Sequence, residues 1–112
     1  MRRTLRDIVM GRKNPYREFE KSLGYHFRDR ALLEAALTHR SFRFENHEVE
    51  EDNQRLEFLG DAVLGLATAA YLYDKFEDKD EGWLTSLRSQ VTSGKALAGL
   101  AHEVRVGEQV RL

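Results

Sequence analysis

Residues 53–64 read Asn-Gln-Arg-Leu-Glu-Phe-Leu-Gly-Asp-Ala-Val-Leu and open the most hydrophobic segment of the chain. From position 56 onward, apolar residues recur every three or four positions, which predicts a long helix with one stripe facing a core. This stripe consists of Leu56, Leu59, Val63, Leu66, Ala70 and Tyr73.

A second stripe runs beside the first and carries small residues at its centre. Its members are Phe58, Ala62, Gly65, Ala69 and Leu72. Small side chains allow the backbone of another helix to approach closely. We therefore expect the helix to be covered on most sides.

Two acidic residues share the remaining face of the predicted helix. Glu57 and Asp61 stand one helical turn apart, and Gln54 lies on the same face one turn earlier. Like charges at this spacing repel each other by roughly 0.2 to 0.5 kcal/mol, so we expect a stabilising partner. The positive end of the helix dipole or a bound divalent cation would serve, and the residues alone leave both interpretations open.

The composition predicts one compact, mostly helical domain. The chain has 112 residues, of which 41% are hydrophobic and 33% charged, and its single proline is Pro15. It contains no cysteine, which excludes disulfides and thiolate metal sites. We find no apolar run that approaches the length needed to span a bilayer, so we expect a cytoplasmic protein without a membrane partner.

Charge is distributed unevenly along the chain. Residues 1–30 carry nine basic against four acidic side chains, residues 31–81 five against thirteen, and residues 82–112 four against two. A polyanion would be attracted to the two ends and repelled by the middle unless cations neutralise it. A solvated surface with uneven charge explains the same distribution, so charge alone selects neither interpretation.

The same periodicity predicts four further helices and thus an all-α fold. They occupy residues 15–23, 29–37, 81–91 and 95–104. We expect Phe19 and Leu23 to face inward in the first of these. In the second, we expect the buried face to consist of Leu32, Leu33, Ala36 and Leu37.

Three segments are less determined by their residues. Residues 1–14 are basic with a short apolar set, and a docked helix, a basic arm on RNA and a frayed end all remain open. Residues 43–52 lack periodicity and predict a loop whose acids are solvated. His39 could bind a phosphate or carboxylate, or it could stabilise the C-terminal end of the preceding helix.

Residues 53–64 and three flanking stretches resemble the ribonuclease III family in order and spacing. The flanking stretches are Leu-Gly-Tyr-His-Phe at 23–27, Ala-Leu-Thr-His-Arg-Ser at 36–41 and Asp-Glu-Gly-Trp-Leu-Thr-Ser-Leu-Arg at 80–88. The resemblance implies the helical nuclease domain of the bacterial enzyme over residues 17–112, packed around the helix that starts at 53–64. Residues 1–16 would form a basic extension.

The family resemblance also implies a function and a set of site residues. The activity would be divalent-metal-dependent hydrolysis of double-stranded RNA in RNA processing, giving 5'-phosphate and 3'-hydroxyl ends. Glu57 would ligate Mg²⁺, or Mn²⁺ as a substitute, and Asp61 would be both a metal ligand and the catalytic residue. Glu81 matches an acid near the family's site, and Gln54 stands where the bacterial enzyme commonly has another acid. No small-molecule cofactor is implied.

The family's nuclease domain works as a homodimer with the signature helices close to the interface. By resemblance, the candidate interface residues are Phe58, Ala62 and Gly65, from the small-residue stripe.

This chain also departs from the family pattern. The family's nuclease domain continues into a helix that bears an aspartate and a glutamate, and a double-stranded RNA-binding domain usually follows. Neither is present here, so we expect the 112-residue chain alone to bind metal weakly and to be inactive.

Two other interpretations remain open. The chain could be a short relative that binds RNA or a partner without cutting, or a helical dimerisation module in which the motif serves packing alone. The reading frame beyond Leu112 separates a truncated nuclease from a short relative.

Overall fold

The computed structural model describes residues 14–112 as a chain of helices. Their bounds are α2 (Arg17–Leu23), α3 (Arg30–Ala36), α4 (Arg40–Glu45), α5 (Gln54–Lys75), α6 (Glu81–Val91), α7 (Gly94–Glu103) and the 3-10 turn η1 (Val106–Glu108). Over these residues there is no strand, only one isolated bridge between Thr38 and Arg111. The predicted all-α fold is confirmed, while the helix considered within residues 1–14 lies outside the described part except at its last position.

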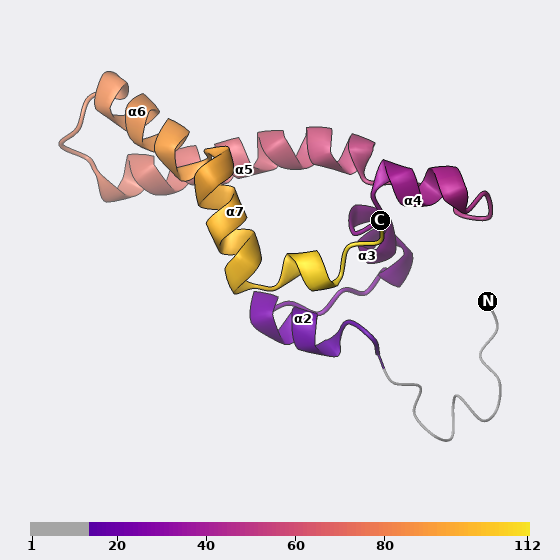
Figure 1. Ribbon diagram of the computed structural model, residues 1–112. Helices are drawn as coiled ribbons and strands as arrows, with labels where there is room; N and C mark the ends of the chain where they lie inside the picture. Colours follow the sequence, from indigo (N-terminus) through magenta and orange to yellow (C-terminus); the bar gives the residue numbers. More distant parts are fainter. Residues whose placement is uncertain (1–13) are drawn as a thin grey trace.

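The helices are arranged as an open ring rather than a layered bundle. In Figure 1, α5 forms one long side, α6 and α7 return from its far end, and η1 brings the C-terminus back beside α3. The molecule measures 59 × 32 × 20 Å, so it is elongated. This shape leaves few elements to cover α5.

Local capping signals define where α3, α6 and α7 begin and where α2 ends. The side chains of Asp29, Asp80 and Ser93 accept hydrogen bonds from backbone N–H groups in the first turns of α3, α6 and α7, at 2.9 to 3.2 Å. Gly24 ends α2 with φ of 68°, a left-handed conformation that glycine adopts without steric strain. These helix ends follow from residues next to them in the sequence.

The hydrophobic core lies where the first helices meet the C-terminal segment. Phe19, Leu33 and Leu37 are buried there, and the side chains packed against them are Tyr16, Phe27, Val104, Val106 and Val110. Three side chains that we expected inside lie outside: Leu23 and Leu32 are 40% and 48% exposed, and Ala36 is also exposed. On α3, Leu33 and Leu37 stand one turn apart and set the inward face, which turns Leu32 and Ala36 toward solvent.

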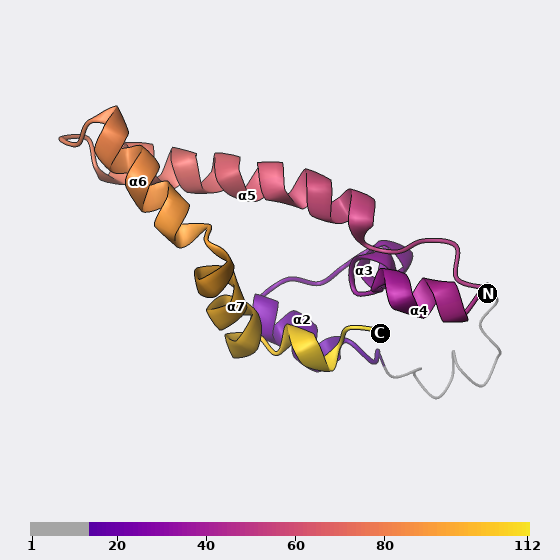
Figure 2. The same cartoon turned by 45° about the horizontal axis from the view of Figure 1, so that its top comes forward.

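The long helix α5 is not covered on most sides, and this expectation was wrong for the described chain. Leu72 is its only buried residue, whereas Phe58 is 85% and Leu66 73% exposed. The reason is that α6 packs against the C-terminal half of α5, while the rest of α5 stands apart from the other helices (Figure 2). Apolar side chains from both stripes of α5, among them Phe58 and Leu66, thus have no partner within the described chain.

Helix α5 also corrects the expectation about membrane spans. It has 22 residues and contains an 18-residue window with a mean hydropathy of 1.2, so it is long and apolar enough to cross a bilayer by length and composition. Asp61 lies within it, and an acidic side chain in the hydrocarbon core costs several kcal/mol. A helix of this kind requires some apolar partner, whether lipid or protein.

The segment after α3 forms a short helix that we did not predict. Residues Arg40–Glu45 form α4, so the loop expected at 43–52 is helical in its first three positions. The Nδ1 atom of His39 accepts a hydrogen bond from the backbone N–H of Ser41 at 3.1 Å. His39 therefore stabilises the start of α4 and not the C-terminal end of α3.

Glu20 joins α2 to the turn that follows it. Its carboxylate is buried and accepts hydrogen bonds from the backbone N–H of Phe27 at 2.5 Å and from the side-chain amide of Asn14. His26 lies 3.0 Å from the same carboxylate. The Phe27 N–H above all, then Asn14 and His26, hold the pKa of Glu20 below its ordinary value.

This arrangement predicts a pH-dependent stability. The carboxylate of Glu20 stabilises the fold above the ordinary pKa of 4.5, and the contribution is lost as the pH falls through the lower folded-state pKa. Glu20→Gln should lower the thermal midpoint at pH 7, and the difference from wild type should shrink toward pH 3. Glu18→Gln, at an exposed position on the same helix, is the control. An equal effect of both substitutions would contradict the role of Glu20.

The position of the core predicts unequal effects of two neighbouring leucines. Leu33→Ala should destabilise the chain by about 2 to 5 kcal/mol, because it leaves a cavity beside Phe19 and Leu37. Leu32→Ala should change stability by no more than about 1 kcal/mol, because its side chain is half exposed. Urea unfolding measures both, and similar values would show that the inward face of α3 is assigned wrongly.

Candidate active site

The candidate site lies on the first two turns of α5. Asn53 precedes the helix, and its backbone carbonyl accepts a hydrogen bond from the N–H of Glu57 at 2.8 Å. The side chain of Asp52 accepts from the N–H of Gln54 at 3.0 Å and satisfies another free donor of the first turn. The start of α5 is therefore well defined.

Glu57 and Asp61 are exposed on one side of this helix start. Gln54, Glu57 and Asp61 line a single open hollow, the site hollow, together with Phe58, Gly60, Leu64 and, from α7, Leu97. None of the ion pairs formed among residues 14–112 involves Glu57 or Asp61. Two adjacent carboxylates without a cationic side chain between them form an electronegative spot that is open to a ligand.

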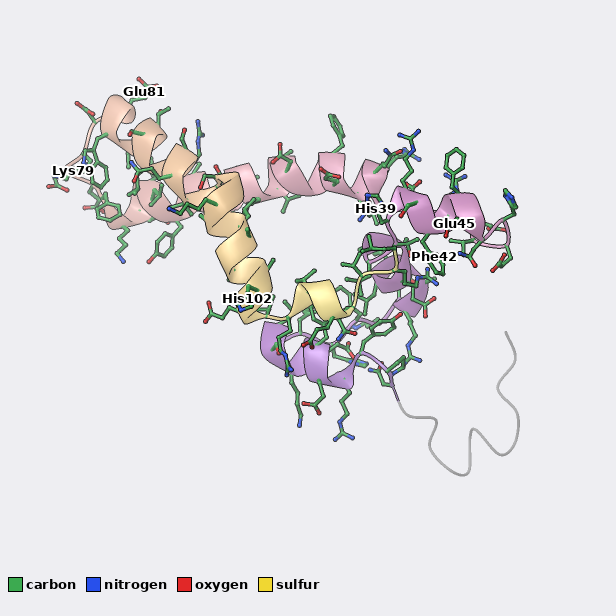
Figure 3. All side chains as sticks on the ribbon, in the orientation of Figure 1. His39, Phe42, Glu45, Lys79, Glu81 and His102 are labelled. Atoms are coloured by element: carbon green, nitrogen blue, oxygen red, sulfur yellow. The ribbon has the colours of Figure 1, made fainter. Side chains whose placement is uncertain are left out.

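Glu81 is not brought to this hollow. It lies at the start of α6, beside the turn at the far end of α5, whereas His39 lies close to the start of α5 (Figure 3). Its carboxylate faces Thr85 and lines a different hollow with Leu72 and Arg88. At 1.5 Å per residue, Leu72 stands about 16 Å along α5 from Asp61, so a shared site within one chain is excluded.

The donors present suit a hard cation, but their number is small. Carboxylate oxygens are the ligands that Mg²⁺ prefers, and Glu57 and Asp61 supply them from one face. Within residues 14–112 no group of three or more His, Cys, Asp or Glu side chains gathers as a metal site would require. Glu57 and Asp61 thus fit as part of a metal site and do not complete one.

The candidate interface residues face open space. Phe58 is 85% exposed, Ala62 is exposed, and a Cβ added at Gly65 would meet nothing within 4 Å. Phe58, Ala62 and Gly65 therefore are not covered by a described helix of the same chain, unlike Leu72 at the far end of the same stripe, which is buried.

Asp52 was assigned to a solvated acidic run, and this assignment was wrong. Its side chain is only 10% exposed and pairs with Arg43 at 3.4 Å. The N–H of Gln54 first, and the Arg43 guanidinium next, hold the pKa of Asp52 below its ordinary value. The signal in the sequence was an aspartate just ahead of a strong helix pattern, a position where an acid commonly anchors a helix start.

The chain is similar to known proteins in sequence and in structure. The family model described as "Ribonuclease-III-like" matches residues 29–112. Ribonuclease 3 of Helicobacter pylori (strain G27) is 46% identical over 99 residues, which are 88% of this chain and 39% of that protein. Ribonuclease 3 of Treponema denticola is 43% identical over 101 residues, or 90% and 41% of the two chains.

Solved structures give a consistent result. The nuclease domain of ribonuclease III from Campylobacter jejuni superposes with a TM-score of 0.78 at 40% identity, covering 87% of this chain and 64% of that one. That structure is described as showing structural flexibility in the region involved in dimer formation. The present chain spans about two fifths of the length of the relatives it matches. By fold and by sequence, the chain belongs to the ribonuclease III family.

Proposed function

We propose that this chain is the nuclease part of an endoribonuclease that hydrolyses phosphodiester bonds in double-stranded RNA. The observation that carries the proposal is the pair Glu57 and Asp61, which stand exposed on one helix face in a member of this family. Duplex RNA is recognised mostly through its shape, phosphates and 2'-hydroxyls, which suits a polar, open site. The products would carry 5'-phosphate and 3'-hydroxyl ends, and the reaction would belong to cytoplasmic RNA processing.

We assign the metal-binding role to Glu57 and Asp61 and the catalytic role to Asp61. Both carboxylates would hold Mg²⁺, or Mn²⁺ in its place, and Gln54 could contribute its carbonyl oxygen. The bound ion would neutralise phosphate charge and lower the pKa of a coordinated water. Because two carboxylates leave most of the coordination shell of Mg²⁺ unfilled, the 112-residue chain alone should bind the ion weakly and cut slowly or not at all.

We further propose that a second copy of the chain covers the exposed stripe of α5. Phe58 and the small residues Ala62 and Gly65 offer an apolar surface that a partner helix could approach closely. The nuclease domain from Campylobacter jejuni has a region involved in dimer formation, which supports a protein partner over lipid. In such a dimer Glu81 could lie near the partner's acids, so its accessory role remains a prediction.

A second function is favoured by one observation. The described residues gather no third acid at Glu57 and Asp61, which is also what a relative that binds duplex RNA without cutting it would show. The two functions differ in whether the protein cleaves duplex RNA, and, if it does, whether cleavage requires Glu57 and Asp61.

The catalytic proposal predicts the effect of neutralising the two acids. The test uses a chimera in which residues 29–112 of this chain take the place of the matching segment of Helicobacter pylori ribonuclease 3. This chimera should cut a labelled RNA duplex only in the presence of Mg²⁺ or Mn²⁺. Glu57→Gln and Asp61→Asn should each lower the cleavage rate by about 100-fold or more, the size typical of losing one charge-stabilising group. Glu77→Gln, on the turn after α5, is the control. Undiminished cleavage in both acid variants would show that the site is elsewhere.

The dimer proposal predicts a change of mass. The wild-type chain should sediment at about twice its 13.0 kDa, and Phe58→Glu should shift it to the monomer, because a carboxylate cannot be buried unpaired in an apolar interface. Phe44→Glu replaces a phenylalanine that is 69% exposed on α4 and should leave the dimer intact. A wild-type monomer, or wild-type chain that floats with lipid vesicles, would contradict the proposal.

A further inference from the structure

Thr38 lies in the short segment between α3 and α4 and is hydrogen-bonded to both its own segment and the C-terminal end of the chain. Its side chain is fully buried, and its hydroxyl donates to the carbonyl of Glu34 at 2.5 Å. The same hydroxyl oxygen accepts from Nε and Nη2 of Arg111 at 2.9 and 2.5 Å. The two bonds from Arg111 join residues 73 positions apart. Together with the bond to Glu34, they use the one donor and two acceptor positions of the Thr38 hydroxyl.

Arg111 is committed to this contact. Its backbone N–H donates to the carbonyl of Leu37 at 2.7 Å, and its carbonyl accepts from the N–H of His39 at 2.8 Å. The guanidinium lies over the ring of Phe42, 4.8 Å from the centroid. It forms no ion pair with any acid in residues 14–112, so Thr38 and Phe42 are its partners there.

Thr38 is connected to the start of α5 through Asn53. The carbonyl of Thr38 accepts from the N–H of Asn53 at 2.9 Å, and the Asn53 side-chain amide donates to the carbonyl of Ala36 at 3.3 Å. The carbonyl of Asn53 then accepts from the N–H of Glu57. A continuous path of hydrogen bonds thus runs from Arg111 to the backbone of Glu57.

The side chain of Asn53 does not perform the task usual for its position. An asparagine just before a helix normally accepts a hydrogen bond from an N–H of the first turn, and here it makes no such bond. It donates to the end of α3, while Asp52 satisfies the N–H of Gln54. The helix start is therefore tied to α3 by a residue that could otherwise have capped it.

We infer that Thr38, Arg111 and Asn53 are positioning residues, which hold the Glu57–Asp61 face of α5 in place against the corner of α3 and α4. The inference rests on the proposed function, because it assigns a purpose to the position of those two acids. Since α6 packs only against the C-terminal half of α5 and Phe58 and Leu59 near its start are 85% and 58% exposed, the orientation of the first turns depends on this connection. None of the three residues touches the cation or the RNA in this assignment.

Two variants separate positioning from mere stability. Thr38→Val keeps the shape of the side chain and leaves the two Arg111 donors without their acceptor. Asn53→Ser retains a good helix-capping residue but is too short to reach the carbonyl of Ala36. Thr38→Ser restores the hydroxyl. Thr92→Val is the matched control, because the Thr92 hydroxyl only donates to the carbonyl of Arg88 at the end of α6.

The experiment measures two quantities on the full chain. Mn²⁺ affinity is determined by electron paramagnetic resonance, and amide hydrogen exchange is followed for Gln54 to Glu57. Thr38→Val and Asn53→Ser should each weaken Mn²⁺ binding and accelerate exchange by about tenfold, the effect typical of losing a group that orients a metal ligand. Thr38→Ser should return both quantities to within about twofold of wild type, and Thr92→Val should leave both unchanged, with helix content by circular dichroism equal in all variants.

Each outcome is decisive for one of the two proposals. Unchanged Mn²⁺ affinity in Asn53→Ser and Thr38→Val, with wild type binding normally, would overturn the positioning role even if exchange accelerates. If wild type binds no Mn²⁺, the proposed metal role fails, and the connection stands only if exchange accelerates in both variants and recovers in Thr38→Ser. Failure of Thr38→Val to fold leaves Asn53→Ser to decide.

Discussion

The packing of the C-terminal segment onto α2 and α3 is the interaction on which the rest of the structure depends. Val104, Val106 and Val110 complete the core around Leu33, because α2 and α3 are too short to bury their apolar faces against each other alone. The same segment places Arg111 on Thr38. The contact of the C-terminal segment with α2 and α3 thus completes the core. Through Arg111 and Thr38, it is also connected to Asn53, the residue that precedes α5.

In this arrangement most apolar side chains of α5 remain exposed to solvent. It is connected to the ring at Asn53 and packed by α6 near Leu72, and between these points its apolar stripe has no partner in residues 14–112. The same openness leaves Glu57 and Asp61 accessible from solvent. Exposure of the acids and exposure of the stripe therefore have one cause, which is why the proposed metal site and the proposed dimer surface lie on the same helix.

Local features of this fold could be predicted from the sequence, because their causes are local. Periodicity located α2, α3, α5, α6 and α7 but not the short α4, and Gly24 ends α2 in a left-handed conformation that glycine adopts without strain. The inward face of α3 could not be predicted, because Leu32 and Leu33 are equally apolar and only the C-terminal valines select between them. Nor could the openness of α5 be predicted, since an apolar stripe shows that a partner is needed but not which chain supplies it.

The shared face of Glu57 and Asp61 could be predicted from the sequence, whereas the surroundings of that face could not. The spacing of Glu57 and Asp61 placed them on one face, and the structure brings Gln54 and Leu97 beside them. The distance to Glu81 depends on α6 packing near the far end of α5, which no local pattern encodes. The connection from Arg111 through Thr38 to Asn53 joins segments far apart in sequence and uses residues with ordinary polar side chains.

Anomalous diffraction from crystals of the protein grown with Mn²⁺ tests the central claim most directly. The account predicts a peak within coordinating distance of the carboxylates of both Glu57 and Asp61. It would be contradicted by crystals in which Mn²⁺ occupies only other acids, such as Glu48, Glu50 and Glu51 before α5, while Glu57 and Asp61 remain open to solvent without an ion.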